Sequence, residues 1–422
     1  MKNNIRFDLS EYLIHFFRDV DQESKSFILF PEHAGFTNLN QSTKLDALFL
    51  MRCALRHQKL CATWSYRNQT RAIYGKRPAI CFTDMPLAAF LKTSTERMAR
   101  GENIGQYALM LPKSVMFTSG SRPVIYALSS DDIQIQHTNN KEERIISPEL
   151  LPLDEQYRYV TYNPSSNRPI DWTHEREWRW PYKKDVSAFN KEIEEDGFCE
   201  DLESYPGLKF SELNVIGAGI LVHDESDIRK VLFDILTLVD RGFINQKAFK
   251  FIIQTSKLTS HLDVLAPKAL SDLINDNIID LSSYFCVEEN YAQNICNEVD
   301  EIIKEEIEKA NLSTEDFGSE YGRSWVWVVE NQPMFTRALM KANKININKE
   351  GRYLVGIDEI SFFPLRKQEY ICKKIGIRLT EKYLQKCTYF SVMGKDDYDS
   401  VPFYTNFTDE QHEFYNSTIN VD

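Results

Sequence analysis

The residues best suited to chemistry are two glutamates in residues 172–181, WTHEREWRWP. If this segment is one strand, its side chains alternate between the faces of a sheet, and Glu175, Glu177 and Arg179 share one face. The two carboxylates then lie about 7 Å apart, and the guanidinium keeps at least one of them ionised near neutral pH. The pair suits acid–base or electrostatic catalysis, while a salt bridge backed by tryptophans is the more ordinary interpretation.

Several strands and helices of the first half must position this segment. Residues 12–18 are apolar and aromatic, as in a buried strand, with His15 in the middle. Residues 77–86 form a second expected strand, stopped by Pro86, which suits the first turn of a helix that runs to about residue 100. Residues 43–60 predict a helix with an apolar face, and residues 106–110 and 122–128 predict further strands.

The middle of the chain predicts a β-α-β unit and then a connector. Residues 185–205 are acidic with few apolar anchors, which favours a solvated excursion or a lid. Residues 219–223 and 249–253 are expected strands around an amphipathic helix that Gly242 ends. Residues 287–309 predict an acidic helix with an isoleucine and valine stripe.

The last quarter predicts a second α+β domain. Residues 324–329, 351–355 and 389–392 have strand character, and residues 335–342 and 365–379 have helical character. The expected division is therefore residues 1–258, a helical connector over 259–317, and an accessory domain over 318–422.

Composition excludes several classes of protein. The chain has 422 residues, a net charge of −12 and 42% hydrophobic residues, which is typical of a folded protein that does not bind polyanions broadly. The eight cysteines contain no CxxC pair, so we expect free thiols and no zinc site. The charged N-terminus and the absence of a long apolar run predict a cytoplasmic protein without a signal peptide or a membrane span.

Three strand-borne features occur in a suggestive order: His15, then Phe82 and Thr83, then Glu175-Arg176-Glu177. This order resembles the ADP-ribosyltransferase fold, in which three strands of a split sheet supply a polar residue, a hydroxyl residue and a glutamate. Residues 12–16 are similar to the start of DarT-type toxins. The segments CFTDMPL (81–87), RPVIY (122–126) and EREWR (175–179) resemble the AbiGi-type proteins of bacterial abortive phage infection. The resemblance covers roughly residues 8–255, and residues 318–422 look like an uncharacterised bacterial accessory domain.

The resemblance implies that NAD is the substrate and that the N-terminal domain has a split sheet. Cleavage of the nicotinamide–ribose bond builds positive charge on the ribose carbon, which a fixed carboxylate stabilises. The resemblance gives that role to Glu177 and deprotonation of the acceptor to Glu175.

The resemblance also implies residues that hold NAD. His15 would bind the adenosine-side ribose, Thr83 would support the catalytic strand, and Phe82 or Tyr107 would stack on nicotinamide. Arg18 would bind the pyrophosphate, because guanidinium binds phosphate through two parallel hydrogen bonds.

Each of these residues also has a local interpretation. A histidine in an apolar strand is usually a core residue whose ring nitrogens are hydrogen-bonded. Thr83 is suited to cap the following helix. Arg18 beside Asp19 suits an exposed ion pair. DarT-type toxins bind the nucleotide phosphate and a DNA base with a further Arg or Asn that has no clear counterpart here, although Arg97 and Arg100 are possible substitutes. The acceptor therefore stays open.

The leading hypothesis is a mono-ADP-ribosyltransferase that acts as a toxin or effector in anti-phage defence on a protein or nucleic-acid acceptor, with an antitoxin or another defence protein as a further partner. Alternatives are an NAD glycohydrolase and a non-catalytic interaction or sensor protein. A nuclease is weaker, because residues 395–399, KDDYD, are its only metal-binding candidate.

Overall fold

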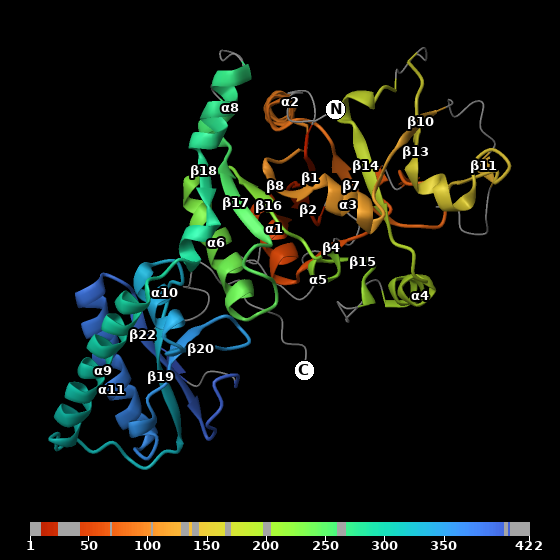
Figure 1. The fold of residues 1–422 in the computed structure, drawn as a ribbon. Coiled ribbons are helices and arrows are strands. Elements are labelled where there is room, and N and C mark those ends of the chain that lie inside the picture. Colours follow the sequence, from red (N-terminus) through yellow and green to blue (C-terminus); the bar gives the residue numbers. More distant parts are fainter. Residues whose placement is uncertain are drawn as a thin grey trace. The chain divides into compact units, whose positions relative to one another are not determined.

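The computed structural model describes residues 10–23, 43–67, 70–102, 104–127, 135–136, 143–164, 170–196, 204–259, 267–400 and 404–405. Within these ranges the chain forms two compact units. The N-terminal unit is drawn from Met1–Ile228 and Lys247–Asp280, and the C-terminal unit from Arg229–Gln246 and Leu281–Tyr415. The chain is thus a mixed α/β protein with one large and one small sheet (Figure 1).

A single mixed sheet of eight strands is the framework of the N-terminal unit (Figure 1). Its spatial order is β18 (Ile278–Asp280), β17 (Phe249–Gln254), β16 (Ala218–Val222), β8 (Tyr107–Pro112), β1 (Tyr12–Phe17), β7 (Ala79–Thr83), β14 (Glu177–Pro181) and β9 (Arg122–Pro123). Strands β1 and β7, in the middle of this order, pair at one position only, Ile14 with Thr83, whereas β1 and β8 pair along six residues. Only β16 and β17 pair in parallel within the sheet.

The parallel pair belongs to the expected β-α-β unit. All five residues of β16 are buried, as in a central parallel strand that is covered on both faces. Helix α6 (Glu225–Asp240) makes the crossover. Gly242, with φ of 73°, follows the helix and has the left-handed conformation that glycine adopts most readily.

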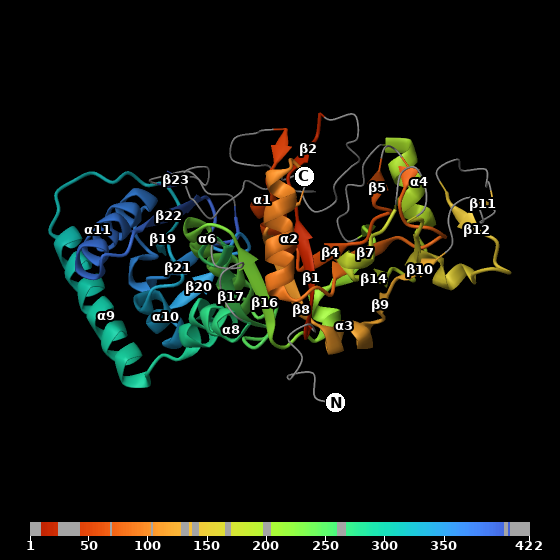
Figure 2. The ribbon, with the colours of Figure 1, turned by 90° about the horizontal axis from the view of Figure 1, so that it is seen from above.

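One face of the large sheet packs against helix α2 (Leu87–Ala99) (Figure 2). On β1 this face carries Ile14 and Phe16, and the Phe16 ring lies 5.9 Å from the Phe90 ring of α2. Ile14, Phe90 and Met110 belong to one buried cluster between helix and sheet. We call this side of the sheet the α2 face.

The remaining elements of the N-terminal unit are short or peripheral. The helices are α1 (Ala47–Arg56), α3 (Lys113–Ser119), α4 (Ser187–Asp196), α5 (Phe210–Leu213), α7 (Ser256–Thr259) and α8 (Pro267–Asp276). The strands are β2 (Val20–Asp21), β3 (Lys44–Leu45), β4 (Lys59–Cys61), β5 (Tyr66–Arg67), β6 (Thr70–Arg71), β10 (Ile125–Ala127), β11 (Ile135–Gln136), β12 (Ile145–Ile146), β13 (Tyr159–Thr161) and β15 (Gly207–Lys209). Helix α4 occupies the first part of residues 185–205, the segment expected to be a solvated excursion or a lid.

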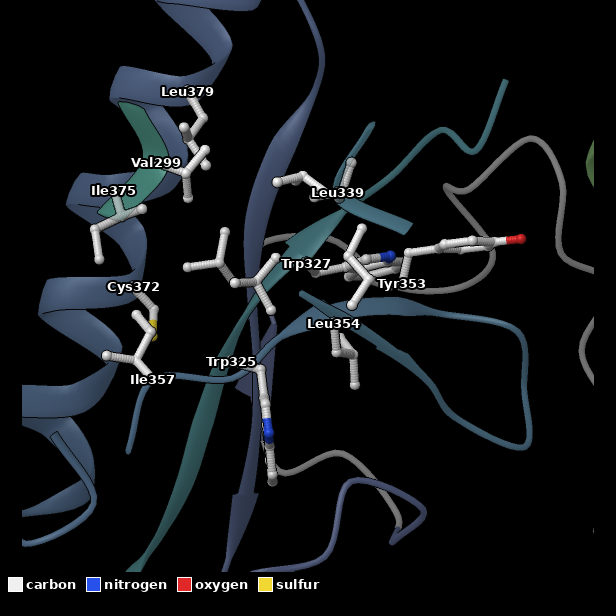
Figure 3. Packing of buried hydrophobic residues seen from close by; sticks show 14 of the residues in the cluster. Val299, Trp325, Trp327, Leu339, Tyr353, Leu354, Ile357, Cys372, Ile375 and Leu379 are labelled. Carbon is white, nitrogen blue, oxygen red and sulfur yellow. The ribbon is translucent and has the colours of Figure 1, made fainter. Parts of the chain in front are cut away.

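The C-terminal unit is an antiparallel sheet that packs with helices. Its strands lie in the order β20 (Ile345–Ile347), β21 (Tyr353–Val355), β19 (Gly322–Val328), β22 (Cys387–Met393) and β23 (Tyr404–Thr405). The helices are α9 (Glu289–Asn311), α10 (Met334–Lys341) and α11 (Leu365–Tyr383). Figure 3 shows Ile375 and Leu379 of α11 beside Val299 of α9, next to the sheet that carries Trp325 and Trp327.

Helix α9 has the buried stripe that the sequence predicts, which includes Ile295, Val299 and Ile302. The stripe lies in the same core as β19 and α11, so α9 is part of the C-terminal unit and not a free connector. Strand β18, also within the expected connector, joins the large sheet. These contacts place α9 in the C-terminal unit and β18 in the N-terminal unit, whereas the sequence had assigned both to a connector over residues 259–317.

A buried polar network ties the C-terminal half of α6 into the C-terminal unit. Arg337 binds both carboxylate oxygens of Asp240, at 2.6 and 2.8 Å, and both side chains are 5% exposed. The Tyr353 hydroxyl donates to Asp240 at 2.7 Å, and Asn331 donates to that hydroxyl at 2.9 Å. Burial and the charge of Asp240 raise the pKa of Tyr353 well above its ordinary value. The hydroxyl therefore stays protonated as a donor.

The change Asp240→Asn should destabilise the C-terminal unit strongly. It leaves the Arg337 guanidinium buried without a countercharge, which typically costs about 3–5 kcal/mol. Thermal unfolding of the full chain should show the loss. The control is Lys341→Gln, which removes the exposed pair with Glu289 at 3.6 Å and should cost less than about 1 kcal/mol. Equal effects would show that the Asp240 network is not a stability determinant.

Candidate functional site

The segment with the two glutamates bends where a continuous strand was expected. Thr173–Glu175 form a 3-10 turn, Arg176 has a left-handed backbone with φ of 47°, and β14 begins only at Glu177. The prediction that Glu175, Glu177 and Arg179 share one strand face was therefore wrong for Glu175. A left-handed conformation costs a non-glycine residue roughly 1–2 kcal/mol, so other contacts must hold it.

Two backbone contacts hold the bend against the end of β7. The Asp84 amide donates to the Arg176 carbonyl at 3.1 Å, and the Thr83 hydroxyl donates to the Glu175 carbonyl at 2.6 Å. Thr83 is 4% exposed and pairs directly with Glu177 across the ladder. Its hydroxyl also accepts from the Met85 amide at 3.1 Å. Thr83 thus links the two strands rather than capping α2, whose N-cap is Pro86.

Each glutamate has its own guanidinium. Arg97 of α2 donates to Glu175 at 2.9 Å and to Glu102 at 2.6 Å. Arg179 donates to Glu177 at 2.7 and 3.3 Å, so the second pair is bidentate. Arg97 was considered as a phosphate ligand from the sequence. In the structure its side chain holds Glu175, the expected acceptor base.

The Glu177–Arg179 pair is the more deeply buried of the two. The Arg179 side chain is 6% exposed and the Glu177 side chain 15%. Arg179 also donates to the Tyr157 carbonyl at 2.7 Å, so its position is fixed independently of Glu177. Cys81 lies beside the pair, and burial together with the Glu177 charge raises the pKa of its thiol to about 12. Cys81 is therefore protonated at neutral pH and is no nucleophile there.

Tyr126 is a site residue that sequence reasoning missed. Its hydroxyl donates to the Trp172 carbonyl at 3.0 Å and accepts from the Glu177 amide at 3.3 Å. Burial raises the pKa of Tyr126, and the charges of Glu177 and Glu175 raise it further. The RPVIY segment that contains Tyr126 was the available signal, although no role was assigned to it.

His15 lies on the opposite face of the sheet. Ile14 pairs with Thr83 and Thr83 with Glu177, so these three side chains point to one side, whereas His15 points to the other. The His15 ring lies 5.0 Å from the Phe17 ring, and its Nδ1 lies 2.9 Å from the Cys81 carbonyl. The residue of β1 that is paired with Thr83 is therefore Ile14 and not His15.

The other expected NAD ligands are also not gathered around Glu177. Phe82 is 3% exposed and packs on His15, with rings 5.6 Å apart. Tyr107 pairs with Phe17, on the His15 side, and its hydroxyl donates to Asp227 at 2.9 Å. Burial and Asp227 raise the pKa of Tyr107.

Arg18 follows the last residue of β1. It is four residues beyond Ile14, the position level with Glu177, which is about 13 Å along an extended strand. Arg18, the predicted pyrophosphate ligand, is thus well separated along the strand direction from Glu177, the predicted catalytic residue.

A family model described as "Protein of unknown function (DUF4427)" matches residues 287–417, which include α9 and the small sheet. This segment does not contain Glu175 or Glu177. No curated protein matches the chain, and no solved structure matches it.

The described residues also bear on membrane spans and on metal sites. No helix in the described ranges is long and apolar enough to cross a membrane. The same ranges contain no group of three or more His, Cys, Asp or Glu side chains arranged to hold a metal ion.

The change Thr83→Val should loosen the bend without altering the volume of the side chain. It removes the donor to the Glu175 carbonyl and leaves the Met85 amide unpaired in a buried position, which costs about 1–3 kcal/mol. Chemical denaturation would measure the loss. The control Thr118→Val removes an exposed hydroxyl that bonds to the Ser114 carbonyl and should change stability by less than about 0.5 kcal/mol.

The change His15→Asn should weaken the dependence of stability on pH. Burial lowers the pKa of His15 below its ordinary value of about 6.5. The unfolded chain therefore binds this proton more readily than the folded chain does, so His15 makes the protein less stable as pH falls below about 6.5. Denaturation at pH 7.5 and 5.0 should show a smaller loss in the variant than in wild type. An equal loss would mean that His15 titrates alike in both states.

Proposed function

We propose that the N-terminal unit is an NAD-dependent mono-ADP-ribosyltransferase with an ADP-ribosyltransferase-like fold. The protein would act in the bacterial cytoplasm as a toxin or effector in anti-phage defence, on a macromolecular acceptor. The observation that carries the proposal is the bend at Arg176, which presents Glu175 on a turn and Glu177 at the start of a strand. Residues held in a strained backbone conformation cluster at functional sites. The resemblance of residues 8–255 to AbiGi-type proteins supports the same activity.

The two glutamates would have separate roles in this reaction. As the nicotinamide–ribose bond breaks, the bonding electron pair leaves with nicotinamide and positive charge develops on the ribose carbon. Glu177, oriented by Arg179 through two hydrogen bonds, would stabilise that charge. Glu175 would take the proton of the acceptor nucleophile as the new bond to ribose forms. Arg97 and Thr83 are positioning residues, because they hold the side chain and the carbonyl of Glu175.

The geometry narrows the set of residues that would bind NAD. His15 and Phe82 contact each other on the face away from Glu177, so their proposed ribose and nicotinamide contacts do not belong to the same side as the carboxylate. Tyr126, which bonds to the Glu177 amide, is the better-placed aromatic residue. NAD would then bind beside Tyr126 and the exposed part of the Glu177 side chain.

The change Glu177→Gln tests the proposal. Purified full-length protein is incubated with adenylate-labelled NAD and bacterial extract, and label in protein and nucleic acid is measured. Wild type should transfer label. The variant should transfer at least about 100-fold less, because an electrostatic contact to the transition state is lost. The control Glu155→Gln removes a 43% exposed carboxylate paired with Arg158 and should retain activity.

Three results distinguish the candidates. Transfer by wild type that Glu177→Gln abolishes supports the transferase. Release of free ADP-ribose without any macromolecule, also lost in Glu177→Gln, identifies an NAD glycohydrolase instead. No reaction of NAD with wild type, or full activity of a folded Glu177→Gln variant, contradicts both.

The second candidate function is a non-catalytic interaction or sensor protein of a defence system. The observation that favours it is that Glu177 already has a bidentate partner in buried Arg179, as in a structural ion pair. It predicts that phage defence survives the change Glu177→Gln. Loss of defence together with loss of NAD cleavage would exclude it.

A further inference from the structure

A second polar cluster lies where three neighbouring strands meet one edge of the large sheet. His223 directly follows β16, Thr255 directly follows β17, and Gln106 directly precedes β8. Leu221 pairs with Ala108 and with Ile253, and all three belong to the cluster under α2. Two residues further along their strands, His223, Gln106 and Thr255 extend the same row on the α2 face.

The hydrogen bonds of α2 determine how the Gln106 amide is turned. The hydroxyls of Ser94 and Thr95 both donate to the Leu91 carbonyl, at 2.9 and 2.8 Å. A hydroxyl has one hydrogen, so both hydroxyls must accept from Gln106 Nε2, at 3.1 and 2.8 Å. The Gln106 amide oxygen therefore faces the other way, toward Thr255 and His223.

The orientation of Gln106 in turn determines the tautomer of His223. The Thr255 hydroxyl donates to Gln106 Oε1 at 3.2 Å. His223 Nδ1 lies 3.0 Å from that oxygen and 3.1 Å from Thr255 Oγ1, and both atoms offer it lone pairs. Nδ1 must therefore carry the hydrogen. In the neutral ring, Nε2 then has the free lone pair and is an acceptor.

The support around His223 is rigid, while the ring itself is accessible. Gln106 is 3% exposed, and Ser94 and Thr255 are 0% exposed. His223 is partly exposed, and within the described ranges no hydrogen bond to Nε2 is found. The next residues, Asp224 and Glu225, are exposed carboxylates, which also accept hydrogen bonds. The Glu225 carboxylate lies 3.7 Å from the ammonium of Lys257. Nε2 itself is an acceptor, so a ligand that binds it must bring a donor.

We infer that His223 Nε2 is the recognition group of a second binding site, which takes a small polar ligand through its hydroxyl or ammonium donors. The site is separate from Glu177, because three strands, β8, β1 and β7, lie between β16 and β14, a distance of about 19 Å. The inference does not depend on transfer of ADP-ribose.

Magnetic resonance of the full chain with 15N-labelled histidine tests the tautomer. The signals of the neutral His223 ring should show a protonated Nδ1 and an unprotonated Nε2. The change Thr255→Val keeps the volume, and Gln106 Oε1 still accepts from Nδ1, so this tautomer should persist. A protonated Nε2 in wild type overturns the inference.

Titration with two probes tests the binding and identifies its source. Spermidine supplies ammonium donors and D-glucose supplies neutral hydroxyl donors. One of them should shift the His223 Nε2 signal with saturation. The change His223→Asn keeps a donor at the place of Nδ1 but has no acceptor at the place of Nε2, and it should weaken binding about tenfold. Saturation by spermidine alone identifies an amine ligand, and by glucose an uncharged polyol.

Two outcomes overturn the binding inference. In the first, neither probe shifts the Nε2 signal. In the second, His223→Asn, shown to be folded by its thermal unfolding, binds the probe as tightly as wild type does.

Discussion

The register of three antiparallel strands decides which side chains of the N-terminal unit can act together. Ile14 pairs with Thr83 and Thr83 with Glu177, and side chains of directly paired residues point to the same face. A shift of one residue in β1 would exchange the places of Ile14 and His15. The register is held by the apolar row of β1, because Ile14 packs in the core under α2. Burial of that apolar row therefore sets the register of β1, and the positions of the polar side chains follow from it.

The bend at Arg176 depends on this register. Because Thr83 lies opposite Glu177, its hydroxyl reaches the Glu175 carbonyl on the preceding turn. The bend separates the glutamates into two environments, one paired with Arg97 and one with Arg179. Two carboxylates with different partners are what a reaction with separate charge-stabilising and base roles would require. The same geometry also makes a stable structural link, and both interpretations therefore rest on the same hydrogen bonds.

Buried guanidinium–carboxylate pairs occur in both units with different surroundings. In the C-terminal unit, Arg337 and Asp240 are each 5% exposed, and the Tyr353 hydroxyl also donates to Asp240, as in a buried structural network. In the N-terminal unit, Glu177 keeps part of its surface exposed beside Arg179. The accessible carboxylate is the one suited to contact a ligand.

The long periodic elements were predictable from the sequence. The apolar strand at residues 12–17, the helix that starts after Pro86, the β-α-β unit and the stripe of α9 all have local signals. The division of the chain into domains differed from the expected one. An apolar stripe shows that a helix is packed, but it does not show which element the helix packs against. Helix α9 was expected to be a connector, yet it lies in the C-terminal core. The continuous strand over residues 172–181 was wrong, because its left-handed residue is arginine, which has no sequence signal for that conformation.

The sequence by itself determined which residues have the types needed for chemistry: two glutamates around an arginine, a threonine at a strand end and an isolated histidine. Alternation within one strand also showed that Ile14 and His15 point to opposite faces. The tertiary structure alone decided that Thr83 and Glu177 lie with Ile14 and not with His15, because pairing between strands is set by packing of distant apolar rows. It also decided the tautomer of His223, because residues from α2, β8, β16 and β17 must meet to orient one amide.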